Sequence, residues 1–157
     1  MDALIIFMAE YLPWAAGIGI FLFLVFARDK KKEFRMLIVA FLAGILSRFG
    51  FTEIIRYFYD RPRPFEVAEG LKTLLEHSSG GSFPSGHAAF FFALAMGVFF
   101  YRRIWGTIFF VAALSIGLGR VATGLHWPSD ILAGAVIGIF SAWLVKILLK
   151  NFARGGS

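Results

Sequence analysis

"GSFPSGHAAFFFALAMGVFF", residues 81–100, places a Pro-Ser-Gly-His tetrad directly before one of the most apolar runs of the chain. Apolar runs of this kind recur along the 157 residues, of which 59% are hydrophobic, and the mean hydropathy is +0.75. A soluble domain of this size cannot bury so much apolar surface. The sequence therefore predicts an all-α integral membrane protein, a polytopic transmembrane bundle of about five to six helices.

The expected membrane spans are five apolar stretches of roughly 20 residues: Ala3 to Ala27, Met36 to Phe58, Gly86 to Tyr101, Ile104 to Val121 and Ser129 to Lys150. Pro13 would either kink the first stretch or divide it into an interfacial piece and a span. We expect one integral-membrane domain over residues 1–152 and a disordered tail over residues 153–157. The chain has no cysteine, which excludes disulfides and thiolate chemistry.

The positive charges predict the orientation of the bundle. They gather in the first and third connections and at the C-terminal end: Arg28, Lys30, Lys31, Lys32, Arg35, Arg102, Arg103, Lys146, Lys150 and Arg154. With five spans these segments share one side, which the positive-inside rule makes cytoplasmic. The N-terminus and the connections 59–85 and 122–128 then face outward. Because the net charge of +6 is clustered between spans and forms no basic face, we expect membrane lipids as partners and no nucleic acid.

The first candidate binding segment is "RYFYDRPRPF", residues 56–65. A single arginine at a membrane boundary usually extends its guanidinium to the lipid headgroups. Here Arg56, Arg61 and Arg63 lie within eight residues on the side that the charge rule makes non-cytoplasmic. This concentration of cations favours an anion-binding role.

The opening tetrad is the second segment. Pro84 suits the first turn of a helix, Ser85 can cap it, and Gly86 lets a ligand approach the free amides of the helix start. The plain alternative is an ordinary capped helix. His87 favours a phosphate or carboxylate site, because an imidazole beside such amides can give a proton to a leaving oxygen.

The third segment is "GRVATGLHWPSD", residues 119–130. Asp130 follows His126 by four residues, so its carboxylate can reach the ring N–H, fix the tautomer and stabilise an imidazolium. Alternatively, Asp130 is simply favoured by the helix macrodipole, and His126 lies in a wet loop. Two histidines and an aspartate could also hold a metal. Arginines such as Arg120 would repel a metal cation but neutralise a phosphoryl group, so we expect neither metal nor cofactor.

Together these segments resemble the three-part signature of the type 2 phosphatidic acid phosphatase (PAP2) superfamily, over about residues 48–140. The resemblance implies a metal-independent phosphatase in which His126 is the nucleophile that forms a phosphohistidine, Asp130 orients it, and His87 is the general acid. The implied phosphate-binding residues are Arg56, Arg63, Ser85, Gly86 and Arg120. The family commonly has lysine where this chain has Arg56, and serine where it has Gly119.

Within that superfamily, "RPRPF" and "LLEHSSGGSFPSGH" look most like small bacterial undecaprenyl-diphosphate phosphatases. These act on a lipid carrier at the outer side of the cytoplasmic membrane. Phosphatidic acid and phosphatidylglycerophosphate would make the same demands on the site. The high mean hydropathy argues against a vanadate haloperoxidase, because those enzymes are soluble. A non-catalytic lipid-phosphate carrier is a further alternative, supported by charged residues inside a span. The further possible substrate contacts are Arg61, His77, Arg48 and Glu53.

Small residues also predict helix packing. Gly134, Gly138 and Ala142 recur every four residues on the fifth expected span, which would let a neighbouring helix approach closely. The fourth span offers matching small surfaces at Ala113, Ser115, Gly117 and Gly119.

Overall fold

The computed structural model describes residues 2–25, 30–67 and 80–152, and all regular secondary structure in these ranges is helical. Within these ranges three helices are long and apolar enough to cross a membrane: Lys30–Phe58, Arg103–Ala122 and Pro128–Asn151. Shorter apolar helices cover Ala3–Gly19 and Gly86–Phe99. The predicted all-α bundle is confirmed. In order, the elements are α1 (Asp2–Ile6), η1 (Phe7–Tyr11), α2 (Leu12–Val25), α3 (Lys30–Ile45), η2 (Leu46–Phe51), α4 (Thr52–Phe58), α5 (Pro64–Val67), α6 (Gly86–Phe99), α7 (Arg103–Ala122) and α8 (Pro128–Phe152).

The N-terminal segment stays helical through Pro13. A π-helical turn, η1, comes directly before the proline, and its last bond runs from the N–H of Leu12 to the carbonyl of Phe7. Proline cannot donate to the preceding turn and crowds the carbonyl four residues earlier. The wider π-helical turn accommodates the proline at this position.

The second long helix, α3 to α4, also contains a π-helical turn. The segment η2 carries Arg48, and the N–H of Thr52 bonds the carbonyl of Ser47. This helix begins at Lys30, six residues before the expected Met36, because lysine, glutamate and arginine are good helix formers and extend its first turns. The turn η2 is a local irregularity that the apolar pattern of the sequence does not reveal.

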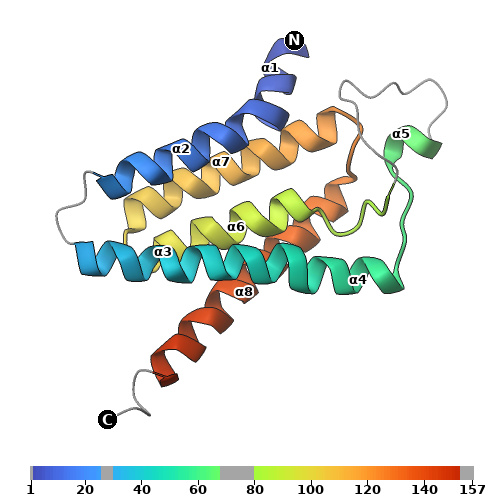
Figure 1. The fold of residues 1–157 in the computed structure, drawn as a ribbon. Coiled ribbons are helices and arrows are strands. Elements are labelled where there is room, and N and C mark those ends of the chain that lie inside the picture. Colours follow the sequence, from blue (N-terminus) through green and yellow to red (C-terminus); the bar gives the residue numbers. More distant parts are fainter. Residues whose placement is uncertain (1, 26–29, 68–79, 153–157) are drawn as a thin grey trace.

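Helix α6 is the centre of the bundle and packs against α3, α7 and α8 (Figure 1). Its neighbours approach closely at small residues. A Cβ atom on Gly138 would lie 2.3 Å from the carbonyl oxygen of Ala89, and one on Gly134 would lie 2.6 Å from that of Ser85. The small stripe of α8 therefore meets α6, and not mainly α7 as its match with the fourth span suggested.

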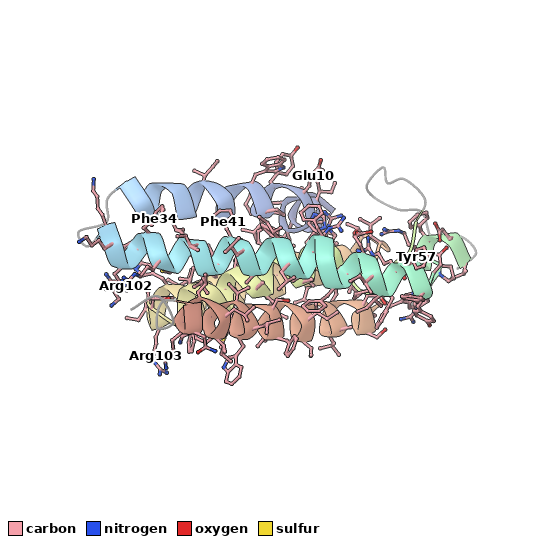
Figure 2. The ribbon with its side chains drawn as sticks, turned by 60° about the horizontal axis from the view of Figure 1, so that its bottom comes forward. Glu10, Phe34, Phe41, Tyr57, Arg102 and Arg103 are labelled. Atoms are coloured by element: carbon pink, nitrogen blue, oxygen red, sulfur yellow. The ribbon has the colours of Figure 1, made fainter. Side chains whose placement is uncertain are left out.

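The two ends of the bundle differ in chemistry. Arg102 and Arg103 lie at one end, together with the start of α3, whereas Tyr57 marks the opposite end (Figure 2). At the basic end Arg102 binds the buried carboxylate of Glu33 through its Nε at 2.8 Å and also through Nη2. The end of α4 and the starts of α6 and α8 meet at the other end, and the three candidate segments meet with them (Figure 1).

Candidate active site

Ser85 caps α6 and also ties it to α8. Its backbone is extended, its hydroxyl accepts the N–H of Ala88 at 3.4 Å, and its own N–H donates to the carbonyl of Asp130 at 3.0 Å. Helix α6 begins at Gly86, so Pro84 stands one residue before the cap and not in the first turn as expected. The second and third segments are thus joined by a main-chain hydrogen bond.

His126 is buried, and a main-chain oxygen fixes its ring. Its Nδ1 lies 2.9 Å from the carbonyl oxygen of Ser82 and 3.5 Å from Oδ2 of Asp130. A carbonyl oxygen only accepts, so in the neutral ring Nδ1 carries the proton and Nε2 keeps its lone pair. The sequence predicted Asp130 as the partner of this N–H; the carboxylate lies close, but Ser82 makes the shorter contact.

The carboxylate of Asp130 is fully buried and already has two other partners. Its Oδ2 accepts the backbone N–H of Trp127 at 2.8 Å, and its Oδ1 accepts Nη1 of Arg61 at 2.9 Å. These bonds hold Asp130 in the first turn of α8. It can therefore stabilise a positive charge on His126 without leaving its place.

Burial lowers the pKa of His126 below its ordinary value. The hydrogen bond to Asp130 raises the pKa, and the charge of Arg63 lowers it again. Burial outweighs the carboxylate, so the imidazole is neutral near pH 7. A neutral ring with a free Nε2 lone pair is the form that can act as a nucleophile.

Arg61 supports the site through contacts with the third segment. Besides Asp130, its Nη1 donates to the hydroxyl of Ser129 at 2.7 Å, and its guanidinium lies 5.1 Å from the ring centre of Trp127. Trp127 in turn donates its indole N–H to the carbonyl of Pro62 at 3.1 Å. The sequence suggested Arg61 as a possible substrate contact; these contacts favour a positioning role.

Arg63 is buried and links the first segment to the third. Its Nε donates to the carbonyl of Gly80 at 3.0 Å, and its Nη1 donates to the carbonyl of Leu125 at 3.0 Å. Burial lowers the pKa of Arg63, but a guanidinium starts so high that it stays charged at neutral pH. Its charge acts on His126, the residue after Leu125, which places a cation beside the candidate nucleophile.

Two further arginines complete the cationic side of the site. Arg56 donates its Nη2 to the carbonyl of Pro84 at 2.9 Å, and Nη2 of Arg120 lies 2.7 Å from Nε2 of His87. The Nε atoms of both arginines are buried and have no hydrogen-bond partner among the described residues. Buried donors without acceptors are rare, and an anion bound between these side chains would satisfy them.

The contact of His87 with Arg120 also determines which ring nitrogen of His87 carries a proton. Arginine only donates, so Nε2 of His87 accepts in this arrangement, and a neutral ring then carries its proton on Nδ1. For His87 to give a proton from Nε2, Arg120 must exchange this contact for another acceptor. A phosphoryl oxygen would be a stronger acceptor for the guanidinium.

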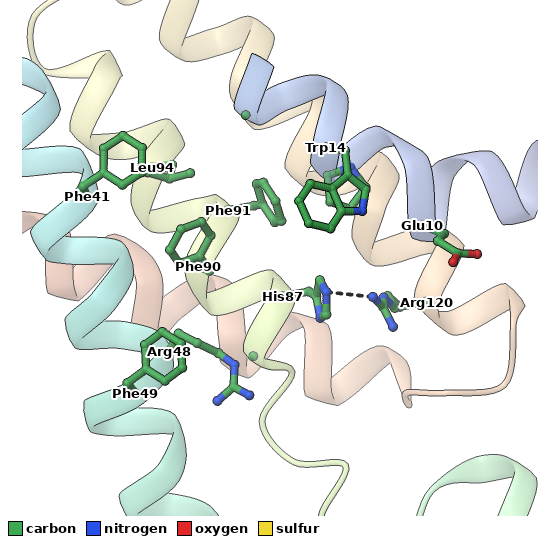
Figure 3. A pocket seen from close by; sticks show the side chains of 13 residues that line it. Glu10, Trp14, Phe41, Arg48, Phe49, His87, Phe90, Phe91, Leu94 and Arg120 are labelled. Carbon is green, nitrogen blue, oxygen red and sulfur yellow. Dashed lines mark hydrogen bonds between the residues drawn. The ribbon is translucent and has the colours of Figure 1, made fainter. Parts of the chain in front are cut away.

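A cavity of about 520 Å³ opens beside His87 (Figure 3). Charged or polar groups lie at one side of it, and the remaining lining is apolar and mostly aromatic. The lining residues are Glu10, Pro13, Trp14, Gly17, Phe41, Arg48, Phe49, Gly86, His87, Phe90, Phe91, Leu94 and Arg120. A pocket with one polar side and a long apolar side suits a molecule with a charged head and a hydrocarbon tail.

Arg48 finds in Glu53 the partner that a charge within a span requires. Its Nη1 makes an ion pair with Oε1 of Glu53, and that same oxygen lies 3.7 Å from Nη1 of Arg56. His77, the remaining possible substrate contact, lies outside the described residues.

Sequence reasoning missed two contributors to this site. Ser82 acts through its main chain, which leaves no signal in residue type. Trp127 has no predicted role in the third segment, yet its ring lies against Arg61 and its backbone N–H donates to Asp130.

Known proteins resemble this chain in sequence and in fold. The sequence model described as the PAP2 superfamily matches residues 35–154. A bacitracin transport permease protein, BcrC, of Bacillus licheniformis is 28% identical over 145 residues, which are 92% of this chain and 70% of that protein. An undecaprenyl-diphosphatase, also BcrC, of Bacillus subtilis is 27% identical over 145 residues, with coverages of 92% and 72%. The crystal structure of Aquifex aeolicus LpxE superposes with a TM-score of 0.69 at 25% identity, over 92% of this chain and 84% of that one.

Proposed function

The chain belongs to the PAP2 superfamily, and from this membership we propose that it is a membrane phosphatase that hydrolyses undecaprenyl diphosphate to undecaprenyl phosphate. The observation that carries the proposal is His126, a buried neutral imidazole whose Nδ1 is held by a carbonyl and whose Nε2 is therefore available. The adjoining cavity, polar at His87 and apolar beyond it, supports a lipid substrate.

In the first step Nε2 of His126 attacks the terminal phosphorus. The bond from that phosphorus to the bridging oxygen breaks, and its electron pair stays on the oxygen. Arg120 turns from His87 to the phosphoryl oxygens, and Nε2 of His87 takes up a proton from solvent. His87 then gives this proton to the bridging oxygen. The lipid leaves as the monophosphate, and Asp130 stabilises the charge on the phosphorylated imidazole.

In the second step a water oxygen attacks the phosphohistidine. His87 takes the proton of that water, the phosphorus–nitrogen bond breaks, and its electron pair returns to Nε2 of His126. Inorganic phosphate leaves, His87 returns its proton to solvent, and Arg120 resumes its contact with Nε2, which restores the starting site. The buried Nε atoms of Arg56 and Arg120, with Arg63, Ser85 and the amide of Gly86, hold the phosphoryl oxygens during both steps.

We further propose that the protein lies in a bacterial cytoplasmic membrane with this site on the outer face. Support comes from the separation of the basic end from the end that holds the site (Figure 2). A phosphate carried on a membrane lipid would meet such a site at the headgroup level.

The mechanism is tested with protein purified in detergent, by following phosphate release from undecaprenyl diphosphate, phosphatidic acid and phosphatidylglycerophosphate with a chelator present. We expect the fastest turnover with undecaprenyl diphosphate, unchanged by the chelator and absent in His126→Ala. Loss of activity on chelation would exclude the metal-independent mechanism. Full activity in His126→Ala would exclude His126 as the nucleophile. Faster turnover of another lipid would identify that lipid as the preferred substrate in place of undecaprenyl diphosphate.

The non-catalytic alternative, a lipid-phosphate carrier, would bind these lipids and release no phosphate. The same assay separates it from the phosphatase, because a carrier shows binding of the lipid without turnover.

A further inference from the structure

We propose that Arg48 makes the site selective for diphosphates, by binding the phosphate that leaves with the lipid. The inference rests on the proposed function, since it assigns one residue of that site to one half of the substrate. It concerns a side chain that lies outside the three sequence segments and belongs to the π-helical turn η2.

Arg48 lies against the start of α6. A Cβ atom on Gly86 would come within 2.5 Å of Nε of Arg48 and 2.6 Å of its Cδ. A larger residue at position 86 would therefore displace the side chain of Arg48 from the start of α6. In Figure 3 the guanidinium of Arg48 lies below His87, on the other side of that ring from Arg120.

The residues that line the cavity indicate where the second phosphate would lie. His126 is not among the residues that line the cavity, whereas His87, Arg48 and Gly86 are. If the bridging oxygen receives its proton from His87, the transferred phosphoryl group lies on the His126 side. The part of the substrate that leaves then lies in the cavity, which Arg48 lines together with the apolar side chains of Phe90 and Leu94.

The charge of the leaving group distinguishes the two substrate classes. A lipid monophosphate releases an alcohol, which is neutral after one proton transfer. A lipid diphosphate releases a phosphate, whose negative charge must be balanced in a cavity that is otherwise mostly apolar. The planar fork of arginine matches phosphate oxygens in pairs, so Arg48 meets a need that only the diphosphate creates.

Glu53 keeps this cation in place. It pairs with Arg48 through Nη1, so Nε and Nη2 are the donors that remain for a phosphate, and Nε is the atom nearest the Cβ position of Gly86. Glu53 also lies near Arg56, so one carboxylate is shared between two guanidinium groups and a positive charge remains.

The test compares two substrates that differ by one phosphate, farnesyl diphosphate and farnesyl monophosphate, in the full-length protein. In Arg48→Gln we expect kcat/KM for the diphosphate to fall about 10- to 100-fold more than for the monophosphate. Arg48→Lys should recover part of the loss. Arg35→Gln, which removes an exposed cation at the basic end, is the matched control and should change neither.

His87→Ala should show the opposite selectivity. An alkoxide needs a proton to leave far more than a phosphate does, so loss of the acid should slow the monophosphate more. Inhibition gives a readout that does not depend on turnover: inorganic pyrophosphate should inhibit Arg48→Gln about tenfold less strongly than the wild type, whereas inhibition by inorganic phosphate should be unchanged.

The outcomes separate this inference from the proposed function. Equal losses on both substrates in Arg48→Gln, or an unchanged response to pyrophosphate, would overturn the role of Arg48 and leave the phosphatase in place. A wild-type protein that hydrolyses only the monophosphate would also overturn it. A wild-type protein that hydrolyses neither would instead overturn the proposed function.

Discussion

The ring of His126 takes its orientation from the main chain. The carbonyl of Ser82 holds Nδ1, and Asp130 stands nearby as a buried charge with bonds of its own. Orientation and charge stabilisation, which a histidine–aspartate pair usually combines, are here shared between two groups. The two functions can therefore be separated by mutation.

The first prediction concerns pH. Because the pKa of His126 is lowered, its neutral form persists below the ordinary imidazole range, and the nucleophile is lost only as the pH falls through the lowered value. Ring NMR resonances of the three histidines, with His126→Ala for assignment, should show this residue titrating below about 6.5.

The variant Asp130→Asn gives the sign of the carboxylate's effect. Asp130 raises the pKa of His126, so its neutral replacement should move the titration to still lower pH and reduce kcat. A higher titration midpoint in this variant would contradict the stabilising effect of the carboxylate on the imidazolium. A wild-type ring that titrates above the ordinary value would contradict the dominance of burial over that carboxylate.

Arg61 supplies a second prediction for a single residue. Arg61→Gln removes a charged hydrogen bond to Asp130, so kcat should fall about tenfold while KM changes little. Arg61→Lys should retain part of the activity. A raised KM with unchanged kcat would instead identify Arg61 as a substrate contact.

The residues of this site could be predicted from the sequence better than their contacts. Residue types at fixed spacing within short segments identified His87, His126, Asp130 and the arginines as candidates. The bond from His126 to Ser82 joins positions 44 residues apart, and that from Arg61 to Asp130 joins positions 69 apart. Such contacts depend on how α6 and α8 pack, which the sequence pattern does not specify.

Among the helices, the contact between α6 and α8 carries the geometry of the site. Backbones approach closely at Gly134 and Gly138, and the hydrogen bond from Ser85 to Asp130 lies at the end of the same contact. A change in the distance between these helices would therefore move the second segment relative to the third.

This contact gives a prediction about stability. Gly138→Ala places a methyl group against the backbone of α6, where little can yield, and should destabilise the fold by about 1–3 kcal/mol. Gly19→Ala in α2 is the matched control, because a Cβ atom there meets nothing within 4 Å. Thermal unfolding in detergent should show a lower Tm for the first variant and an unchanged or slightly higher Tm for the second; equal Tm values would contradict the close contact.

The sequence predicted that the long helices exist, but it did not predict where α3 starts or that a π-helical turn interrupts it. Apolar length indicated each long helix, because a bilayer requires it. The early start of α3 at Lys30 and the π-helical turn around Arg48 follow from helix propensity and packing. A hydropathy pattern reports neither of these.

For the whole molecule, the separation of the two ends predicts topology. The chain has no cysteine, so a single introduced thiol reports one position. In intact cells a membrane-impermeant reagent should label Asp60→Cys, near the site, and should label Lys31→Cys, at the basic end, only after the membrane is opened. The reverse pattern would place the site on the cytoplasmic side.

The opposite placement of basic connections and candidate segments could be predicted from the order of spans, because each crossing reverses the side. The cavity could not, since its walls come from segments far apart in the chain and its shape depends on side-chain packing.

The bond between His126 and Ser82 has a consequence for how such a protein can change during evolution. Every residue type has a main-chain carbonyl, so the orientation of the nucleophile does not depend on which side chain occupies position 82. Because the side chain of Ser82 is buried, only small residues fit at that position, and these can replace serine while the imidazole keeps its tautomer. When related proteins are compared, the backbone path near position 82 therefore says more about the orientation of His126 than the residue type at that position does.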